Sequence, residues 1–183
     1  TLGFSGRAES LYFFGRELSM TGETVRNLVA AARTLDVDGT VGDDSFLAAR
    51  TINLSGELGS TAFAAAETVN LYEEAFVNGA LFAAGRVVNI SGEVDGDLYV
   101  GAQKLVISGR VNGNVTVGAE KIELKEGAVI TGDFTYDSPR ELSESELSIV
   151  QGSVTFEEFD PEKKWMEKPW FLRIGKWVAA ILF

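Results

Sequence analysis

A repeat of 17 residues runs through most of the chain and restricts its fold more than any other feature. Two consecutive units align without a gap: VNISGEVDGDLYVGAQK (88–104) and LVISGRVNGNVTVGAEK (105–121). Upstream, the same frame continues in units that begin at Leu18, Leu35 and Ile52. A unit of this size cannot bury its apolar side chains alone, but it can when it stacks on copies of itself. The repeat therefore predicts a solenoid.

The pattern inside one unit indicates strands and not helices. With the unit numbered from place one to place seventeen, apolar residues fall at places one, three, seven, eleven and thirteen. This alternation is typical of short strands. Glycine recurs at places five and nine, where it suits a corner because it accepts a positive φ, and small residues at places fourteen and fifteen indicate a third corner. We therefore expect an all-β, right-handed parallel β-helix (a β-solenoid) of about nine coils, with three short strands in each.

Two units contain two extra residues, near Tyr72-Glu73-Glu74 and near Lys125-Glu126-Gly127. Both insertions fall at a corner, so we expect them to bulge without disturbing the strands. The whole chain is expected to divide into a β-helical domain (1–156), a charged linker (157–169) and an apolar C-terminal segment (170–183). The sequence begins inside the repeat without an initiator Met, which indicates a fragment or a processed form.

The apolar C-terminal segment is expected to contact a membrane as a helix. Trp170, Phe171 and Trp177 lie close to Arg173 and Lys176 and are typical of an interfacial belt. The residues that follow would then begin a transmembrane helix, although the apolar run is much shorter than the ~20 residues that a span needs. The alternative is an amphipathic helix that covers the last coil of the solenoid.

Composition argues against several classes of function. A formal net charge of −11 disfavours nucleic acid as a partner, because nucleic-acid binding requires clustered Lys and Arg. The chain contains no His and no Cys, and so lacks the commonest general base and the usual transition-metal ligands. Its carboxylates are scattered over the corners, and no calcium-binding repeat is present. We therefore expect no enzymatic activity, no cofactor and no metal site.

Two columns of equivalent places suggest contacts between coils. Asp36, Asn53, Asn70 and Asn89 share place two, where side-chain amides could hydrogen-bond from coil to coil; we expect a structural role more than ligand binding. Place twelve holds an aromatic stripe, which consists of Tyr12, Phe46, Phe63, Phe82 and Tyr99 and is interrupted by Val29. Places eleven and thirteen should point inward, so the stripe should point outward and mark a contact surface. The alternative is a local flip, because Phe63 lies between two alanines and could turn into the core.

The most regular units also resemble a known family. ISGEVDGDLYVGA and ISGRVNGNVTVGAEKIEL, followed by GAVITGDFTY and SPRELSES, resemble the bactofilins, the polymer-forming cytoskeletal family of bacteria. The resemblance covers Thr1 to about Phe156. It implies a β-helical core that polymerises end to end without nucleotide and serves as a scaffold on membranes. The alanine-rich early coils and the apolar C-terminus resemble a membrane-anchored branch, which would place the rod outside the cytoplasm, although a cytoplasmic location stays open.

These observations lead to one main functional hypothesis and one alternative. We expect a structural scaffold that is tethered to a bacterial membrane and assembles with itself, with a cell-wall or membrane protein as a further partner. Phe4, Phe13 and Phe156 lie in the terminal coils and are expected to be buried by end-on stacking. The alternative is a monomeric extracytoplasmic binding module that presents the aromatic stripe to a glycan or a protein.

Overall fold

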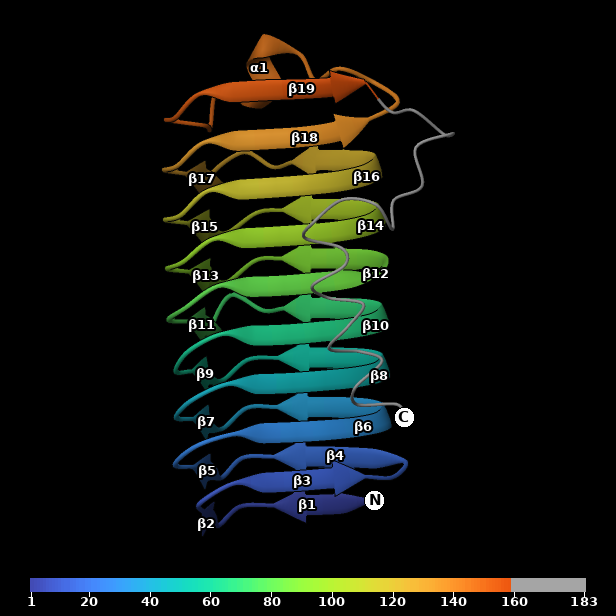
Figure 1. The fold of residues 1–183 in the computed structure, drawn as a ribbon, viewed down its shortest axis with the longest axis vertical. Helices are drawn as coiled ribbons and strands as arrows, with labels where there is room; N and C mark the ends of the chain where they lie inside the picture. Colours follow the sequence, from blue (N-terminus) through green and yellow to red (C-terminus); the bar gives the residue numbers. More distant parts are fainter. Residues whose placement is uncertain (159–183) are drawn as a thin grey trace.

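The computed structural model describes residues 1–158, which form a rod of stacked coils (Figure 1). The predicted parallel β-solenoid of about nine coils is confirmed. Every strand pairing is parallel, and each strand pairs with the equivalent strands of the coils before and after it. The proposed helix at residues 170–183 lies outside the described residues.

The strands form one large and one small sheet. The large sheet contains the long strands β6 (Leu28–Val37), β8 (Ser45–Leu54), β10 (Ala62–Leu71), β12 (Leu81–Ile90), β14 (Leu98–Ile107) and β16 (Val115–Leu124). Its ends are β1 (Leu2–Phe4), β3 (Leu11–Phe14) and β4 (Glu17–Met20) on one side, and β18 (Phe134–Ser138) and β19 (Val154–Glu158) on the other. The small sheet contains β2 (Arg7–Ala8), β5 (Glu23–Thr24), β7 (Thr40–Val41), β9 (Glu57–Leu58), β11 (Phe76–Val77), β13 (Glu93–Val94), β15 (Arg110–Val111) and β17 (Val129–Ile130). A short helix, α1 (Glu144–Leu147), lies near the C-terminal end of the rod.

The expected third corner does not interrupt a strand. Each long strand runs for ten residues from place eleven through places fourteen and fifteen to place three of the next unit. Ala65 at the bend stays paired with Ala48 below it and Ala84 above it. The small side chains let the strand bend sharply while its ladder continues, so a coil has two turns and one bend. In Figure 1 the chain runs to the right in front, returns behind and rises toward its C-terminus, which is right-handed winding.

The corner glycines are required by close packing between coils and not by a positive φ. Among the described glycines, only Gly127 has a positive φ, at 91°. A Cβ built on Gly39, Gly56 or Gly109 would lie less than 3.0 Å from backbone atoms of the coil below. Any side chain at these corners would therefore push neighbouring coils apart and break the ladder, which corrects the expected reason for these glycines.

The core is a narrow apolar column. Ile52, Val88, Leu105 and Ile107 have no exposed surface, as the alternation at places one and three predicts. The two insertions form turns at residues 72–75 and 125–128 and leave the strand register intact, so that expectation is confirmed.

Candidate assembly surfaces

The N-terminal end of the rod exposes both strand edges and large apolar side chains. Within the described residues, β1, β2 and β3 have no strand on their outer side. The exposed fractions are 37% for Leu2, 65% for Tyr12 and 64% for Phe14. Phe4 and Phe13, the two residues predicted for this end, are half-buried and pack against the core. Prediction from sequence missed Phe14 and Leu2, because the first coil fits the repeat only in part.

At the C-terminal end, a segment of the chain itself packs on the core. Residues 139–148 leave the coil path and include α1, which begins with a capping box formed by Ser143 and Glu146, and the chain rejoins the path where Val150 pairs with Ile130. Leu142 is buried, and its backbone N–H donates to the Tyr136 hydroxyl at 3.0 Å. Phe156, the residue predicted for this end, is half-buried, and its ring centroid lies 5.1 Å from that of Tyr136.

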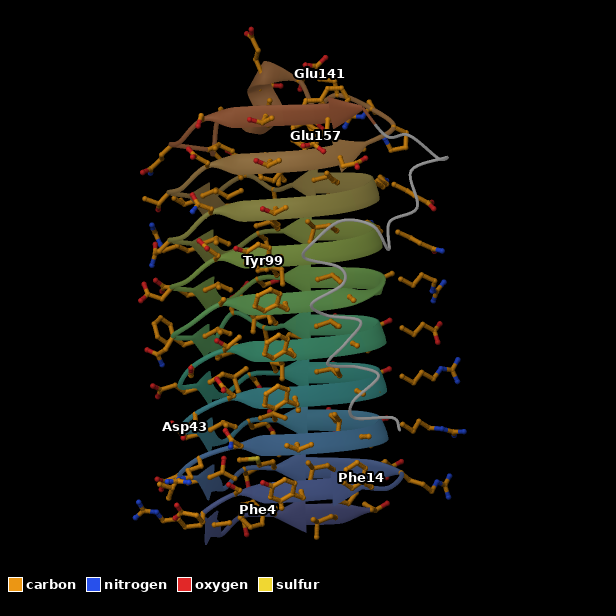
Figure 2. All side chains as sticks on the ribbon, in the orientation of Figure 1. Phe4, Phe14, Asp43, Tyr99, Glu141 and Glu157 are labelled. Atoms are coloured by element: carbon orange, nitrogen blue, oxygen red, sulfur yellow. The ribbon has the colours of Figure 1, made fainter. Side chains whose placement is uncertain are left out.

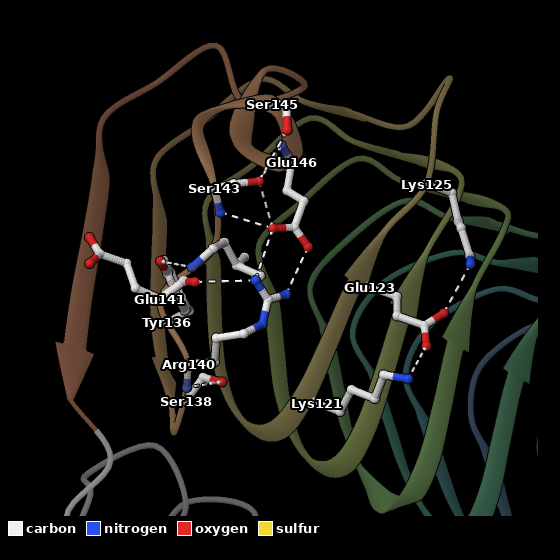
Figure 3. Close-up of polar contacts among 11 residues, drawn as sticks. Lys121, Glu123, Lys125, Tyr136, Ser138, Arg140, Glu141, Ser143, Ser145 and Glu146 are labelled. Atoms are coloured by element: carbon white, nitrogen blue, oxygen red, sulfur yellow. Dashed lines mark hydrogen bonds and ion pairs between the residues drawn. The ribbon is translucent and has the colours of Figure 1, made fainter.

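An Arg140–Glu146 ion pair fixes this C-terminal segment (Figure 3). Arg140 Nη2 lies 2.8 Å from Glu146 Oε1. The guanidinium of Arg140, together with hydrogen bonds from Ser143, lowers the pKa of Glu146 to about 2. The carboxylate is therefore charged at neutral pH and holds the first turn of α1 against the preceding loop.

The aromatic stripe forms a continuous stack over four coils. Ring centroids are separated by 5.2 Å between Phe46 and Phe63, 4.8 Å between Phe63 and Phe82, and 4.6 Å between Phe82 and Tyr99, with interplanar angles of at most 10°. Rings stacked directly face to face would have centroids about 3.5–4.0 Å apart, the contact distance between carbon atoms. The longer separations indicate that the parallel rings are displaced sideways, as in offset stacking. The stack lies on the front face of the rod in Figure 2.

The stacked rings are not part of the core cluster, although Phe82 is only 9% exposed, and the alternative with an inward Phe63 is wrong. Ala62 and Ala64, on either side of Phe63, are buried in the core, and Phe63 itself is only half-buried. Tyr12 shares the column but is separated from Phe46 by Val29, so it does not join the stack. After Tyr99 the column continues as Thr116, Thr135 and Thr155.

Polar ladders connect the coils on other faces. The predicted column at place two is confirmed: Asn53 Nδ2 donates to Asp36 at 2.7 Å, and the two later asparagines continue the chain of bonds at 2.8 Å each. A second ladder, at place ten, was not predicted. There the side-chain oxygens of Asn27, Asp44, Asp97, Asn114 and Asp133 each accept from the backbone N–H of the equivalent residue in the next coil. The run of Asn and Asp at place ten is the signal that could have revealed it.

One carboxylate holds three lysines near the C-terminal end. Glu123 lies 2.9 Å from the Nζ atoms of Lys104, Lys121 and Lys125 (Figure 3 shows the last two). Hydrogen bonds from Lys121, Lys125 and Lys104 lower the pKa of Glu123 far below its usual range. The cluster therefore adds positive charge to this side of the rod.

Two findings on the described residues concern metal binding and membrane crossing. In residues 1–158, no group of three or more acidic side chains is arranged to hold a metal ion. No helix in the described part of the chain has the length and apolar character that crossing a bilayer requires. Trp170, Phe171 and Trp177 lie outside the described residues, so their predicted membrane contact stays a prediction.

Comparison with known proteins identifies one family. Residues 77–155 match the model of the bactofilin family, which is described as polymer-forming and cytoskeletal. This part of the chain is therefore similar to a bactofilin domain, which confirms the resemblance found in the repeat units. No curated protein and no solved structure matches the chain. The match begins in β11, whereas the strand ladders run without a break from β1.

Proposed function

We propose that the chain is a subunit of a bactofilin-type scaffold that assembles end to end through its terminal coils. The observation that carries this proposal is the N-terminal end, where unpaired strand edges coincide with exposed Leu2, Tyr12 and Phe14. A solenoid end of this kind must be capped or paired, because open edges and an open apolar column favour association. The match to a polymer-forming family supports the same role and fits a structural protein better than an enzyme.

The energy of such a contact would come from two sources. A second rod placed on the N-terminal coil would continue the backbone ladder of β1, β2 and β3. It would also remove the exposed surface of Phe14 and Tyr12 from water, at about 25 cal/mol per Å² of apolar area. No nucleotide is needed, because the contact requires only stacking.

We also propose that the assembly is held at a bacterial membrane by the apolar segment 170–183, with the rod outside the cytoplasm. Trp170, Phe171 and Trp177 support this proposal through their sequence pattern alone. A cell-wall or membrane protein would be a further partner. Flotation of the full chain with lipid vesicles, compared with a variant in which all three residues are serine, tests the tether. Equal flotation would contradict it.

Electron microscopy of the purified chain tests the end-on contact. We expect filaments from the natural sequence and single rods from Phe14→Asp, because a charge at the stacking surface loses hydration on contact. The matched control is Tyr72→Asp, which removes an aromatic side chain that is 45% exposed at a corner in the middle of the rod. Filaments from both variants would exclude the N-terminal coil as the contact.

The alternative function is a monomeric binding module, and the ring stack of Phe46, Phe63, Phe82 and Tyr99 is the observation that favours it. The stacked rings form a continuous aromatic ridge along four coils, and aromatic side chains of this kind suit contact with a sugar ring or an apolar protein segment. Single rods from the natural sequence, together with binding to a glycan that is lost in Phe63→Ser, would support this alternative over the scaffold.

A further inference from the structure

The charges of the rod are separated onto different edges. Its most regular cationic column lies at places sixteen and seventeen, where the long strands bend. We call this column the basic edge; it consists of Arg16, Arg33, Arg50, Arg86, Lys104 and Lys121. Figure 2 shows the corresponding row of long side chains, with nitrogen at many of their tips, along the right side of the rod.

The cations of the basic edge extend into solvent. The exposed side-chain fractions are 67% for Arg50, 57% for Arg86 and 66% for Lys121. Two acids, Glu67 and Glu120, interrupt the row, and Glu67 contacts both Arg50 and Arg86, at 3.0 Å and 2.8 Å. The edge therefore keeps a net positive charge along a chain whose formal net charge is −11.

A second edge of the same coils has the opposite charge. At places four to six, where the large sheet turns into the small one, lies the acidic edge, which consists of Glu23, Asp38, Glu57, Glu73, Glu74 and Glu93. Glu23, Glu57 and Glu93 share one register of the small sheet. No Lys or Arg interrupts these places between β5 and β13.

We infer that the basic edge binds the acidic edge of a second copy of this chain, so that rods associate side by side in parallel. Both edges belong to the same coils and therefore repeat at the same spacing of about 4.8 Å. When two such rods lie in register, Arg33 meets Glu23, Arg50 meets Asp38, and Arg86 meets the paired Glu73 and Glu74. Like charges meet in three coils: Glu67 faces Glu57, Arg16 faces Arg7, and Lys121 faces Arg110. The two arginines already offset the charge of Glu67, so the contact depends on the coils between β5 and β13.

This contact has two consequences. It is heterologous, so each added rod leaves one basic and one acidic edge open, and the association does not close. It is also weak for a single pair of rods, because exposed ion pairs contribute about 0–1 kcal/mol each and are screened by salt. Rods already joined end to end would multiply the number of contacts. The inference goes beyond the end-on scaffold and does not require it.

Charge reversal on each edge provides the test. One variant changes the basic edge (R33E/R50E/R86E) and the other changes the acidic residues that face these arginines (E23K/D38K/E73K). At about 20 mM salt we expect the natural chain to associate laterally, and to separate at about 0.5 M because screening shortens the range of the charges. Each variant alone should weaken this association at least tenfold, as measured by sedimentation velocity, with circular dichroism to confirm that the strands are retained.

Mixing the two variants distinguishes a specific contact from a general charge effect. The first variant has acids on both edges and the second has cations on both, so their equimolar mixture should associate again. The matched control compares two single variants that change the net charge equally: R50E on the basic edge should weaken the association, whereas R26E, away from both edges, should associate like the natural chain. A mixture that stays dispersed, or a basic-edge variant that behaves like the natural chain, would overturn the inference.

Two further measurements distinguish this lateral contact from lipid binding and from end-on stacking alone. Binding of the natural chain to anionic vesicles that is lost in R33E/R50E/R86E, without recovery of lateral association on mixing, would assign the basic edge to lipid headgroups instead. Phe14→Asp should shorten filaments but leave lateral association of single rods at low salt unchanged. Loss of lateral association in Phe14→Asp would mean that only the end-on contact exists.

Discussion

At the N-terminal end of the rod, β1 and β3 have an open side in the described part of the chain, and Leu2, Tyr12 and Phe14 are exposed. At the C-terminal end, residues 139–148 leave the coil path, add one helical turn and bury Leu142 against the core. The last strand, β19, also has no strand on its outer side among the described residues. The two ends therefore differ in their side chains: an insertion with a capping box and one ion pair packs at the C-terminal end, whereas the N-terminal end has no such segment and exposes large aromatic side chains.

The cores of the two halves also differ. Place eleven holds the small residues Ser45 and Ala62 in two of the early coils, after Leu28, but Val115 and Phe134 in the late ones. Phe134 and Tyr136 stack in the core at 5.0 Å beneath α1. In the coils of β8 and β10, Phe46 and Phe63 lie in the stripe instead, whereas Phe13 of the first coil packs against the core. The coils with Ser45 or Ala62 at place eleven thus have their large ring on the surface, and the late coil with Phe134 has its rings in the core.

The largest expected effect comes from a substitution in the buried apolar column in the middle of the rod, on which the coils at both ends stack. Ile107→Asp places an unpaired charge in a fully buried column and should lower the free energy of unfolding by more than about 4 kcal/mol. Denaturation with urea, followed by far-UV circular dichroism, measures the loss. The control is Val106→Asp, one residue away on the outer face, and an equal loss in both variants would mean that the inward assignment is wrong.

The next effect should separate the two ends. Leu142→Ala removes a buried side chain of the C-terminal segment and should cost about 2–5 kcal/mol, because it leaves a cavity. Phe14→Ala at the open end should change the stability of the single rod by no more than about 0.5 kcal/mol, since most of the ring is already in water. Thermal unfolding at a concentration where rods are separate makes the comparison. Equal costs would show that the ends are equivalent.

Acid should weaken the C-terminal segment selectively. The folded pKa of Glu146, about 2, lies below the ordinary value of 4.5, so its contribution is complete above pH 4.5 and is lost as the pH falls toward 2. As the pH falls from 4.5 to 2, the melting temperature of the natural chain should approach the melting temperature of Glu146→Gln, and the two temperatures should become equal near pH 2. Hydrogen exchange at residues 142–147 localises the effect. A constant difference across this range would contradict a role for the carboxylate charge.

The smallest effect should be a gain in stability near the open end. The hydroxyl of Thr24 is buried in the core without a hydrogen-bond partner. Thr24→Val keeps the shape of the side chain and removes the unpaired group, so it should raise the free energy of unfolding by about 1 kcal/mol. The control is Thr40→Val, on the exposed side of β7, which should have almost no effect. A loss of stability in Thr24→Val would mean that the hydroxyl is satisfied.

Much of the fold could be predicted from the repeat, because every coil of a solenoid has the same local structure as its neighbours. Alternation at places one and three identified the buried column, and the positions of the insertions identified the corners that bulge. The outward direction of Phe63 also followed from its neighbours in the repeat, since Leu98 and Val100 in the equivalent coil could not leave the core. The ladder from Asp36 to Asn89 required only that equivalent places stack.

Other features depended on contacts between coils that no single unit contains. The ten-residue strands continue through the bend because their ladder is shared with two neighbours, and the corner glycines are required by the coil below and not by their own φ. The segment that packs on the C-terminal end, the three lysines on Glu123 and the separation of charge onto two edges join residues from different coils or outside the repeat. The sequence by itself thus determined the coil and its inward side chains, because these follow from period and polarity. Only the tertiary structure decided which ends and edges are left to bind another molecule, because that depends on how the coils stack.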